Sequence, residues 1–343
     1  MQASPIRFAV IGQGHIGKRH AEMIRRNPQA QLVCVCDVLP PEETGTVGIK
    51  EAYYRSAATM LATEELDVVC VCVPNGLHTH MALMALDSGC HVVIEKPMAL
   101  TTRDAERIIQ RAIERERHVF CVMQNRYSPP SVWLKEVVQS GKLGHIYLVQ
   151  LNCLWNRDAR YYKADGWHGT KDMDGGTLFT QFSHFVDIMY WLFGDIDDIQ
   201  ANLKDFNHQE LTDFEDSGIV TFRFKEHGDA CGVLTFSTAV WDCNLESSLT
   251  IVAERGSVKV SGQYMNEVVY CHIADYEMPQ LAPSNPPNDY GAYKGSAQNH
   301  HYVIQNVVDV LTKGADITTN AYDGLRVVNI IERIYASAGK TGG

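Results

Sequence analysis

The sequence predicts an α/β fold in two parts. An N-terminal doubly wound domain is expected over residues 1–125, followed by an α+β domain with a large, mostly antiparallel open sheet over residues 126–343. Three observations support this prediction. The chain has 343 residues, more than one core usually covers. Short apolar segments alternate with helical ones in the first half, and this alternation then gives way to segments with period-two patterning.

The composition excludes several kinds of partner. A formal net charge of -11 argues against a nucleic-acid partner, because binding to phosphates needs clustered Lys and Arg. The ten cysteines contain no CxxC pair and lie mostly in apolar segments, as is typical of a reducing compartment. No apolar run approaches the roughly 18 residues of a membrane span, and no signal peptide is evident. We therefore expect a cytoplasmic protein with no membrane partner.

The first half contains five segments that are β-branched and apolar on both faces. This is the pattern of strands buried between two helix layers of a parallel sheet. The predicted strands are residues 8–11, 32–36, 68–73, 91–94 and 119–122. The predicted helices between them are residues 16–26, 78–89 and 101–116. In such a sheet, ligands bind beyond the carboxyl ends of the strands.

A glycine-rich segment, GQGHIG, joins the first strand to the first helix. Gly12 permits a tight turn, Gly14 lets the backbone approach a pyrophosphate, and Gly17 allows close helix packing. Asp37 ends the next strand, as the dinucleotide fingerprint requires. The pattern predicts a Rossmann dinucleotide-binding domain. The alternative is a simple turn with a solvated acid nearby. It would require the glycine motif, the strand before it, the helix after it and the acid to occur in this order by chance.

The acid at residue 37 also indicates which dinucleotide binds. Its carboxylate would accept hydrogen bonds from the ribose hydroxyls and repel a 2′-phosphate, and Val38 and Leu39 follow it rather than an arginine. We therefore expect NAD, with NADP disfavoured. His78, in the PNGLH segment after the third predicted strand, has an equally good structural explanation as a helix-terminal hydrogen-bonding residue. The further residues expected at the cofactor are His15, Ile16, Pro74, Asn75, His78, Glu95, Lys96 and Gln124.

A Glu-Lys-Pro tripeptide follows the fourth predicted strand. Lys96 would lie at the sheet edge where the nicotinamide ring is expected, and Pro97 restricts it to an extended conformation and allows a cis peptide. A cationic nicotinamide nearby disfavours the charged form of this lysine. Lys96 could therefore hydrogen-bond or deprotonate a substrate hydroxyl. A surface lysine without function is the alternative.

The second half predicts a sheet with one face covered by helices. The predicted strands are residues 145–155, 217–224, 231–238, 247–253, 257–260 and 267–273. The predicted helices lie within residues 178–193, 299–312 and 322–337. A proline-rich loop at residues 279–291 would reach over a neighbour or a site, and the sequence leaves this choice open. The uncovered sheet face predicts a homodimer or homotetramer.

The helix within residues 178–193 carries polar side chains among apolar ones. Thr180, His184 and Asp187 are four and three residues apart, so α-helical spacing would put them on one face. A histidine in such a place is more often structural than catalytic.

The motifs together resemble those of a known family. GxGxxG with a following His20, Asp37, PNGLH and EKP, in this order, are similar to the Gfo/Idh/MocA nicotinamide-dependent sugar and polyol dehydrogenases. The resemblance covers essentially the whole chain and implies that His184 and Lys96 are the catalytic residues, with no metal. Many members have an acid four residues before this histidine, where this chain has Thr180. That departure shifts the base role onto Lys96 or His184, and the choice stays open.

The segment at residues 156–170 indicates the substrate. With the GG-x-L-x-x-Q-x-x-H pattern that follows, it is similar to the subgroup that oxidises UDP-N-acetyl-2-amino-2-deoxyglucuronate at its third carbon. Such a uronate is anionic at both ends and needs cationic groups. The residues expected at the substrate are Arg126, Arg157, Tyr161, Lys163, Trp167, Thr180 and Gln181.

Three alternatives to this substrate assignment remain. The segment could be a solvated loop with packed aromatic residues. The substrate could be a free sugar, inositol or glycoside. The protein could also be a non-catalytic NAD- or sugar-sensing binding protein, although the intact EKP and His184 argue against this.

Overall fold

The computed structural model describes residues 4–164 and 166–339. The chain forms two compact units, the first made of Met1–Val122 and His300–Val328, the second of Met123–Asn299 and Asn329–Gly343. The predicted domains, 1–125 and 126–343, differ from these units chiefly in residues 300–328. This segment returns to the first unit after the second sheet is complete.

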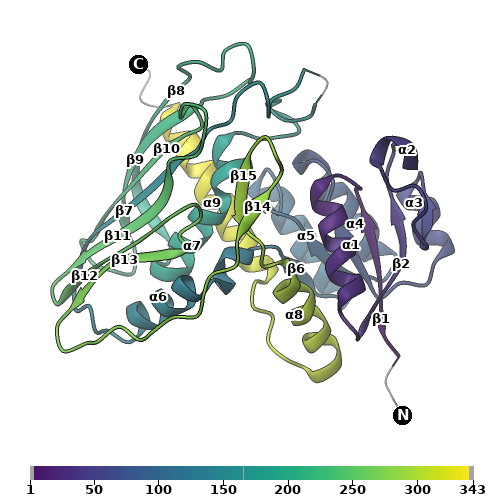
Figure 1. Ribbon diagram of the computed structural model, residues 1–343, viewed down its shortest axis with the longest axis horizontal. Coiled ribbons are helices and arrows are strands. Elements are labelled where there is room, and N and C mark those ends of the chain that lie inside the picture. The colour runs from purple at the N-terminus through teal and green to yellow at the C-terminus, as the bar shows by residue number, and fades with distance from the viewer. Residues whose placement is uncertain (1–3, 165, 340–343) are drawn as a thin grey trace. The chain divides into compact units, whose positions relative to one another are not determined.

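The first unit is built on a six-stranded parallel sheet in the order β3-β2-β1-β4-β5-β6 (Figure 1). Its strands are β1 (Ile6–Ile11), β2 (Ala30–Cys36), β3 (Ala52–Tyr54), β4 (Val68–Val71), β5 (His91–Ile94) and β6 (Val119–Cys121). Its helices are α1 (His15–Arg26), α2 (Pro41–Thr44), α3 (Ala57–Thr63), α4 (His78–Asp87), α5 (Thr102–Glu114) and α8 (His300–Lys313), with the short 3₁₀ helix η1 (Asn75–Leu77). The strand order reverses between β1 and β4, which is where a doubly wound sheet binds its ligand.

The predicted strands and helices of this unit are all present. Strands β1, β4, β5 and β6 are almost fully buried, in agreement with their continuous apolar sequences. The sequence analysis missed β3, α2 and α3, each of seven residues or fewer. Such short elements give too little periodicity to recognise.

The second unit contains a seven-stranded sheet in the order β13-β12-β11-β7-β10-β9-β8. Neighbouring strands are antiparallel except β7 and β10, which are parallel. The strands are β7 (Ile146–Leu154), β8 (Ile196–Lys204), β9 (Ser217–Phe224), β10 (Cys231–Ser237), β11 (Glu246–Ala253), β12 (Gly256–Ser261) and β13 (Glu267–Ile273). The predicted mostly antiparallel sheet is confirmed, and only β8 was missed among its strands.

Helices cover one face of this sheet. They are α6 (Pro129–Gln139), which the sequence analysis missed, and α7 (Ser183–Phe193), as Figure 1 shows. Trp155 and Phe185 meet edge to face between the sheet and α7, with their ring centroids 5.6 Å apart. Strand β9 alternates buried and exposed residues, so that Ile219, on the uncovered face, is 56% exposed. This alternation is the pattern of a sheet with one packed face.

The remaining elements are two short helices, a two-stranded hairpin and the last long helix. The π-helical segment η3 (Leu178–Phe182) leads into α7, and the 3₁₀ helix η2 (Gln124–Tyr127) precedes α6. The hairpin of β14 (Pro287–Asp289) and β15 (Lys294–Ala297) occupies the end of the predicted proline-rich loop. Helix α9 (Ala321–Ala338) begins in the first unit and ends in the second.

Candidate active site

The glycine loop of the first unit has the geometry of a dinucleotide-binding turn. Gly12 has a φ of +94°, in the left-handed region that favours glycine. A Cβ atom on Gly12 would lie 2.3 Å from the carbonyl oxygen of Cys72, and one on Gly17 would lie 1.8 Å from that of Gly12. A Cβ on Gly14 would meet no atom within 4 Å. The loop is therefore tightly packed at Gly12 and Gly17 and open at Gly14, where α1 begins and an anion is favoured.

The carboxylate of Asp37 lies against this loop. It accepts hydrogen bonds from the backbone N–H groups of Gln13, at 2.6 Å, and Leu39, at 2.9 Å. Arg55, just after β3, donates from Nε to the Val38 carbonyl oxygen at 2.9 Å. The sequence analysis missed this arginine, because only the pairing of β2 with β3 brings it next to Asp37.

The turn after β5 carries Lys96, which is half-buried and joined to Pro97 by a cis peptide bond. Buried His78 holds this turn: its Nδ1 lies 2.7 Å from the Pro97 carbonyl oxygen and its Nε2 2.9 Å from that of Val73. Burial lowers the pKa of His78, while its hydrogen bonds to the Pro97 and Val73 carbonyl oxygens oppose this shift. These contacts give His78 a structural part in holding the lysine turn, and its predicted place at the cofactor stays a prediction.

The other residues expected at the cofactor lie at helix starts, in the buried interior of the first unit, or in the second unit. His15 and Ile16 form the first turn of α1, and Asn75 begins η1 after Pro74. Glu95 is buried and turned toward His20. Gln124, in the second unit, has a buried side-chain oxygen with no hydrogen-bond partner among the residues described, as an acceptor for a ligand would have.

Two neighbours of Gln124 share this property and were missed from the sequence. The buried Nδ2 of Asn125 and the buried Oγ of Ser296 find no hydrogen-bond partner in residues 4–164 and 166–339. Asn125 accepts a weak hydrogen bond, at 3.4 Å, from the backbone N–H of Ala297, which follows Ser296. Unsatisfied polar atoms are costly in a protein interior, so this group is a candidate ligand contact.

His184 lies near the start of α7 and is 2% exposed. The hydroxyl of Thr180 donates to the Asp174 carbonyl oxygen at 2.9 Å and also contacts its carboxylate. The prediction that Thr180, His184 and Asp187 share a face assumed α-helical spacing throughout. Residues 178–182 are π-helical, with more residues in each turn, so that this spacing does not apply between Thr180 and His184.

Arg126 forms a buried ion pair with Asp187. Its guanidinium donates to both carboxylate oxygens of Asp187, with the Nε bond at 2.8 Å and the second at 2.5 Å, and both side chains are almost fully buried. It also lies over the ring of Trp191. Its charge is therefore compensated inside the protein by Asp187, and its predicted place at the substrate stays a prediction.

Arg157 is placed very differently, although it is also 2% exposed. Its guanidinium carbon lies 4.7 Å from the ring centroid of Trp155, 5.2 Å from that of Tyr161 and 4.9 Å from that of Tyr293. Its N–H groups donate only to amide and carbonyl oxygens, those of Gln181, Asn156, Asn244 and Lys294. Within the part of the chain that the structure describes, it forms no ion pair with a carboxylate. Burial lowers its pKa.

A polar network extends from Arg157. Gln181 accepts from the arginine at 2.7 Å and donates to the Tyr161 hydroxyl at 2.8 Å. That hydroxyl lies 2.9 Å from Nδ1 of His168, which is 3.6 Å from the carboxylate of Asp174. The structure thus brings Arg157, Tyr161, Gln181 and Thr180 into one network.

The other predicted substrate residues lie at its margin. The ring of half-buried Trp167 is 3.8 Å from that of His168, between centroids. Lys163 is exposed on the same loop. The sequence analysis missed His168 and Asp174, although His168 lies in the segment that supplied Trp167 and Asp174 follows four residues after its end.

Comparison with known families agrees with this arrangement. Residues 6–123 match the oxidoreductase family with an NAD-binding Rossmann fold, Gfo/Idh/MocA, and residues 132–259 match the C-terminal domain of the same family. The chain belongs to the Gfo/Idh/MocA family. The family, the fold class and NAD as cofactor, all predicted from the sequence, are thereby confirmed.

Solved structures of Gfo/Idh/MocA proteins are similar over the whole chain. The WlbA dehydrogenase of Bordetella pertussis, in complex with NADH and UDP-GlcNAcA, has 29% identity and a TM-score of 0.86, over 98% of this chain and 97% of that one. The WlbA dehydrogenase of Chromobacterium violaceum, with the same ligands, has 30% identity and a TM-score of 0.84, over 99% and 95%.

Curated relatives match over a shorter span. The D-glucoside 3-dehydrogenase of Escherichia coli is 30% identical over 203 residues, which are 57% of this chain and 56% of that enzyme. The chain therefore matches about half the length of this relative. Among the described residues, no helix has the length and apolar character needed to cross a membrane.

Proposed function

We propose that this Gfo/Idh/MocA protein is an NAD-dependent dehydrogenase that oxidises a secondary hydroxyl of a nucleotide-sugar uronate such as UDP-N-acetylglucosaminuronate. The observation that carries the proposal is the buried guanidinium of Arg157, which has aromatic rings around it and forms no ion pair with a carboxylate of residues 4–164 or 166–339. A buried cation without a counterion is costly, and an anionic ligand would remove that cost. The likeness to WlbA, which was solved with UDP-GlcNAcA, supports the same substrate class.

The reaction separates a hydride from a proton. The C–H bond of the carbinol breaks, its hydride is transferred to NAD, and the hydroxyl proton passes to a base, leaving a ketone and NADH. NAD supplies the hydride acceptor when bound. The open space at Gly14, the N-terminus of α1 and the carboxylate of Asp37 fit its pyrophosphate and ribose.

The proposed base is Lys96 or His184. A neutral imidazole can accept the hydroxyl proton or polarise the forming carbonyl, and an unprotonated lysine can accept the proton. The acid that many members have at position 180 is replaced here by the contact of Thr180 with Asp174. We propose that Asp174 supplies the negative charge that this position otherwise lacks.

A second candidate substrate is a free glycoside or inositol. The D-glucoside 3-dehydrogenase of Escherichia coli supports it, at an identity similar to that of the WlbA proteins. A neutral sugar would leave Arg157 without a counterion, which is why we favour the uronate.

The test is NADH formation from NAD with UDP-N-acetylglucosaminuronate, UDP-N-acetylglucosamine, myo-inositol and methyl glucoside. We expect kcat/KM for the uronate to exceed that for each of the other three compounds, whose sugar rings carry no carboxylate, by about 100-fold or more. Replacing Lys96→Met or His184→Asn should lower kcat by about 1,000-fold and leave NAD binding nearly unchanged. Equal rates with inositol and the uronate would favour the second candidate, and NAD binding without turnover of any sugar would favour a sensing protein.

We also propose that the protein self-associates through the uncovered face of its seven-stranded sheet. Tyr147, Ile219 and Tyr270 on these strands are each about half exposed. Apolar side chains of this size are seldom left in water over so wide a sheet. Light scattering, with Ile219→Lys as the disrupting variant, would distinguish a dimer or tetramer from a monomer.

A further inference from the structure

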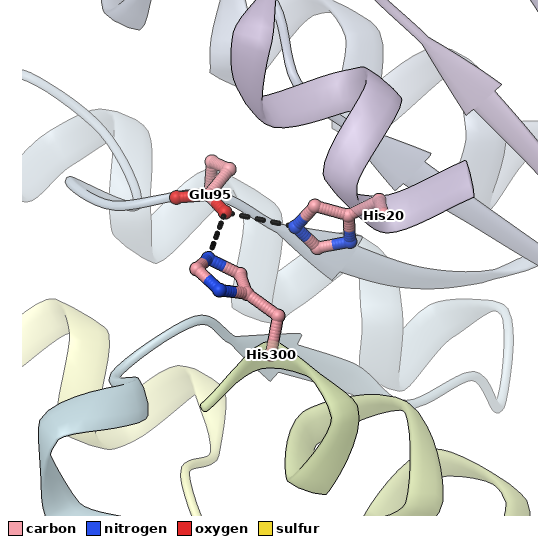
Figure 2. A group of neighbouring side chains, drawn as sticks. All are labelled: His20, Glu95 and His300. Carbon is pink, nitrogen blue, oxygen red and sulfur yellow. Dashed lines mark hydrogen bonds and ion pairs between the residues drawn. The ribbon is translucent and has the colours of Figure 1, made fainter. Parts of the chain in front are cut away.

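Three buried ionisable side chains meet in the first unit next to the lysine turn: His20, Glu95 and His300 (Figure 2). One carboxylate oxygen of Glu95, Oε1, lies 2.8 Å from Nε2 of His20 and 3.6 Å from Nε2 of His300. The first contact is a hydrogen bond, and the second is too long for one. The two imidazole rings meet edge to face, with centroids 5.5 Å apart.

The other carboxylate oxygen of Glu95 faces the catalytic turn. Oε2 accepts a hydrogen bond of 3.2 Å from the backbone N–H of Lys96. The same carboxylate therefore binds His20 of α1, approaches His300 at the start of α8, and holds the backbone of the residue that carries the proposed catalytic ammonium group. Because α1 also begins at the glycine loop, this cluster connects the two parts of the first unit that the proposed function uses.

The charge of the cluster follows from its surroundings. Burial alone would raise the pKa of Glu95, but contacts with the two imidazoles outweigh it and hold this pKa well below its usual range. Burial lowers the pKa of His300. The Glu95 carboxylate is therefore ionised at neutral pH, one residue before Lys96 in the chain.

Two imidazoles and a carboxylate are also a common set of metal ligands, and their ligand atoms lie within 4.8 Å of one another. A histidine that binds a metal almost always donates its other ring N–H to a partner. Here Nδ1 of both His20 and His300 has no hydrogen-bond partner among the residues described. The hydrogen bond between His20 and Glu95 also occupies the position that an ion would need. These features favour a role without a metal.

We propose that Glu95, held by His20 and approached by His300, is a positioning residue for Lys96: its carboxylate fixes the backbone of the lysine turn. This inference rests on the proposed function, because it assumes that Lys96 acts in turnover. It assigns to the buried pair of histidines a role in catalysis that involves no contact with the substrate.

The test is the substitution Glu95→Gln, which keeps the shape of the side chain and an acceptor for His20 but removes the charge. We expect kcat to fall by about 30-fold, while KM for the sugar changes by less than about threefold, because the loss is one of alignment rather than of binding. His300→Phe should lower kcat in the same direction by a smaller factor. His91→Gln, at the opposite end of β5, is the matched control and should keep wild-type kcat.

A double-mutant cycle distinguishes positioning from general stabilisation. If Glu95 acts through Lys96, adding Glu95→Gln to Lys96→Met should change the residual turnover by less than about threefold. An undiminished additional loss in that background would overturn the inference, as would wild-type kcat in Glu95→Gln. So would stoichiometric Zn²⁺ or Co²⁺ binding that Glu95→Gln abolishes. Wild-type turnover in Lys96→Met would instead contradict the proposed function itself.

Discussion

Arg126 and Arg157 lie in the same unit, are equally buried, and were both expected at the substrate. Arg126 makes two hydrogen bonds to the carboxylate of Asp187. Among the described residues, Arg157 packs against aromatic rings and donates hydrogen bonds to the side-chain oxygens of Gln181 and Asn244 and to two backbone carbonyl oxygens. The difference between them is a counterion.

This difference indicates what each arginine does. An arginine paired with a buried acid has its charge balanced in the folded protein, so removing it leaves the acid unbalanced. An arginine surrounded only by neutral groups keeps a net positive charge that a ligand can use. Burial of an arginine is thus no guide to function until its acid partners are known.

The largest expected effect is on the paired arginine. Arg126→Met should lower the free energy of unfolding by about 3–5 kcal/mol, because it leaves the carboxylate of Asp187 buried without a cation. Urea unfolding would measure this loss. Adding Asp187→Asn as the matched second change should restore part of it. If Arg126→Met lost no more free energy of unfolding than Arg157→Met, the proposed difference between the two arginines would be contradicted.

The half-buried acid Glu215 gives a further test of how burial affects a charged group. Glu215 accepts a hydrogen bond of 2.7 Å from the Tyr335 hydroxyl, and burial raises its pKa to about 7. Between its unfolded value of 4.5 and about 7, the folded protein keeps a proton that the unfolded chain has lost. Stability from this group is therefore lost as the pH rises through that window.

The substitution Glu215→Gln removes this pH dependence. We expect the variant to match wild type at about pH 4, below the unfolded value of 4.5, and to exceed it by about 3 kcal/mol at about pH 8, measured by urea unfolding at each pH. Exposed Glu210, in the same segment, gives the control Glu210→Gln, which should not change the difference between the two pH values. Parallel pH profiles for wild type and Glu215→Gln would contradict the assignment.

The smallest of the three effects concerns binding at the unpaired arginine. Arg157→Met should weaken binding of the uronate by about 30-fold, or about 2 kcal/mol, and leave binding of UDP-N-acetylglucosamine, which lacks the ring carboxylate, within about threefold. Calorimetric titration would measure both. Arg160→Met is the control, because Arg160 lies partly exposed beside Asp158 and Asp242. Equal losses of affinity for the uronate and for UDP-N-acetylglucosamine would show that Arg157 does not recognise the ring carboxylate.

Most of the fold could be predicted because its signals are local. The strands of the first sheet are continuous apolar runs, and those of the second alternate with period two. Strand β8 was missed because IDDIQANLK, at the sheet edge, contains two adjacent aspartates and little alternation. Helix α6 was missed because its two leading prolines resemble a loop, although proline is favourable in a first helical turn.

The candidate site likewise contains features that local sequence predicts and others that depend on contacts between distant residues. The glycine loop could be predicted because nearby backbone atoms leave no room for a side chain at Gly12 and Gly17. The roles of Arg126 and Arg157 could not be separated, since the partner of Arg126 is 61 residues away and the isolation of Arg157 is visible only in three dimensions. His300 was likewise missed as a neighbour of Glu95, because nothing in the local sequence of α8 indicates that contact.

The return of residues 300–328 to the first unit has a consequence for biosynthesis. Thr319 pairs with the backbone of Cys121 at the edge of β6, and α8 carries His300 to Glu95. The ribosome must therefore synthesise residues 300–328 before the dinucleotide-binding unit can close. A fragment truncated after residue 122 would lack part of its own interior, so an expression vector for that half should append residues 300–328 through a linker.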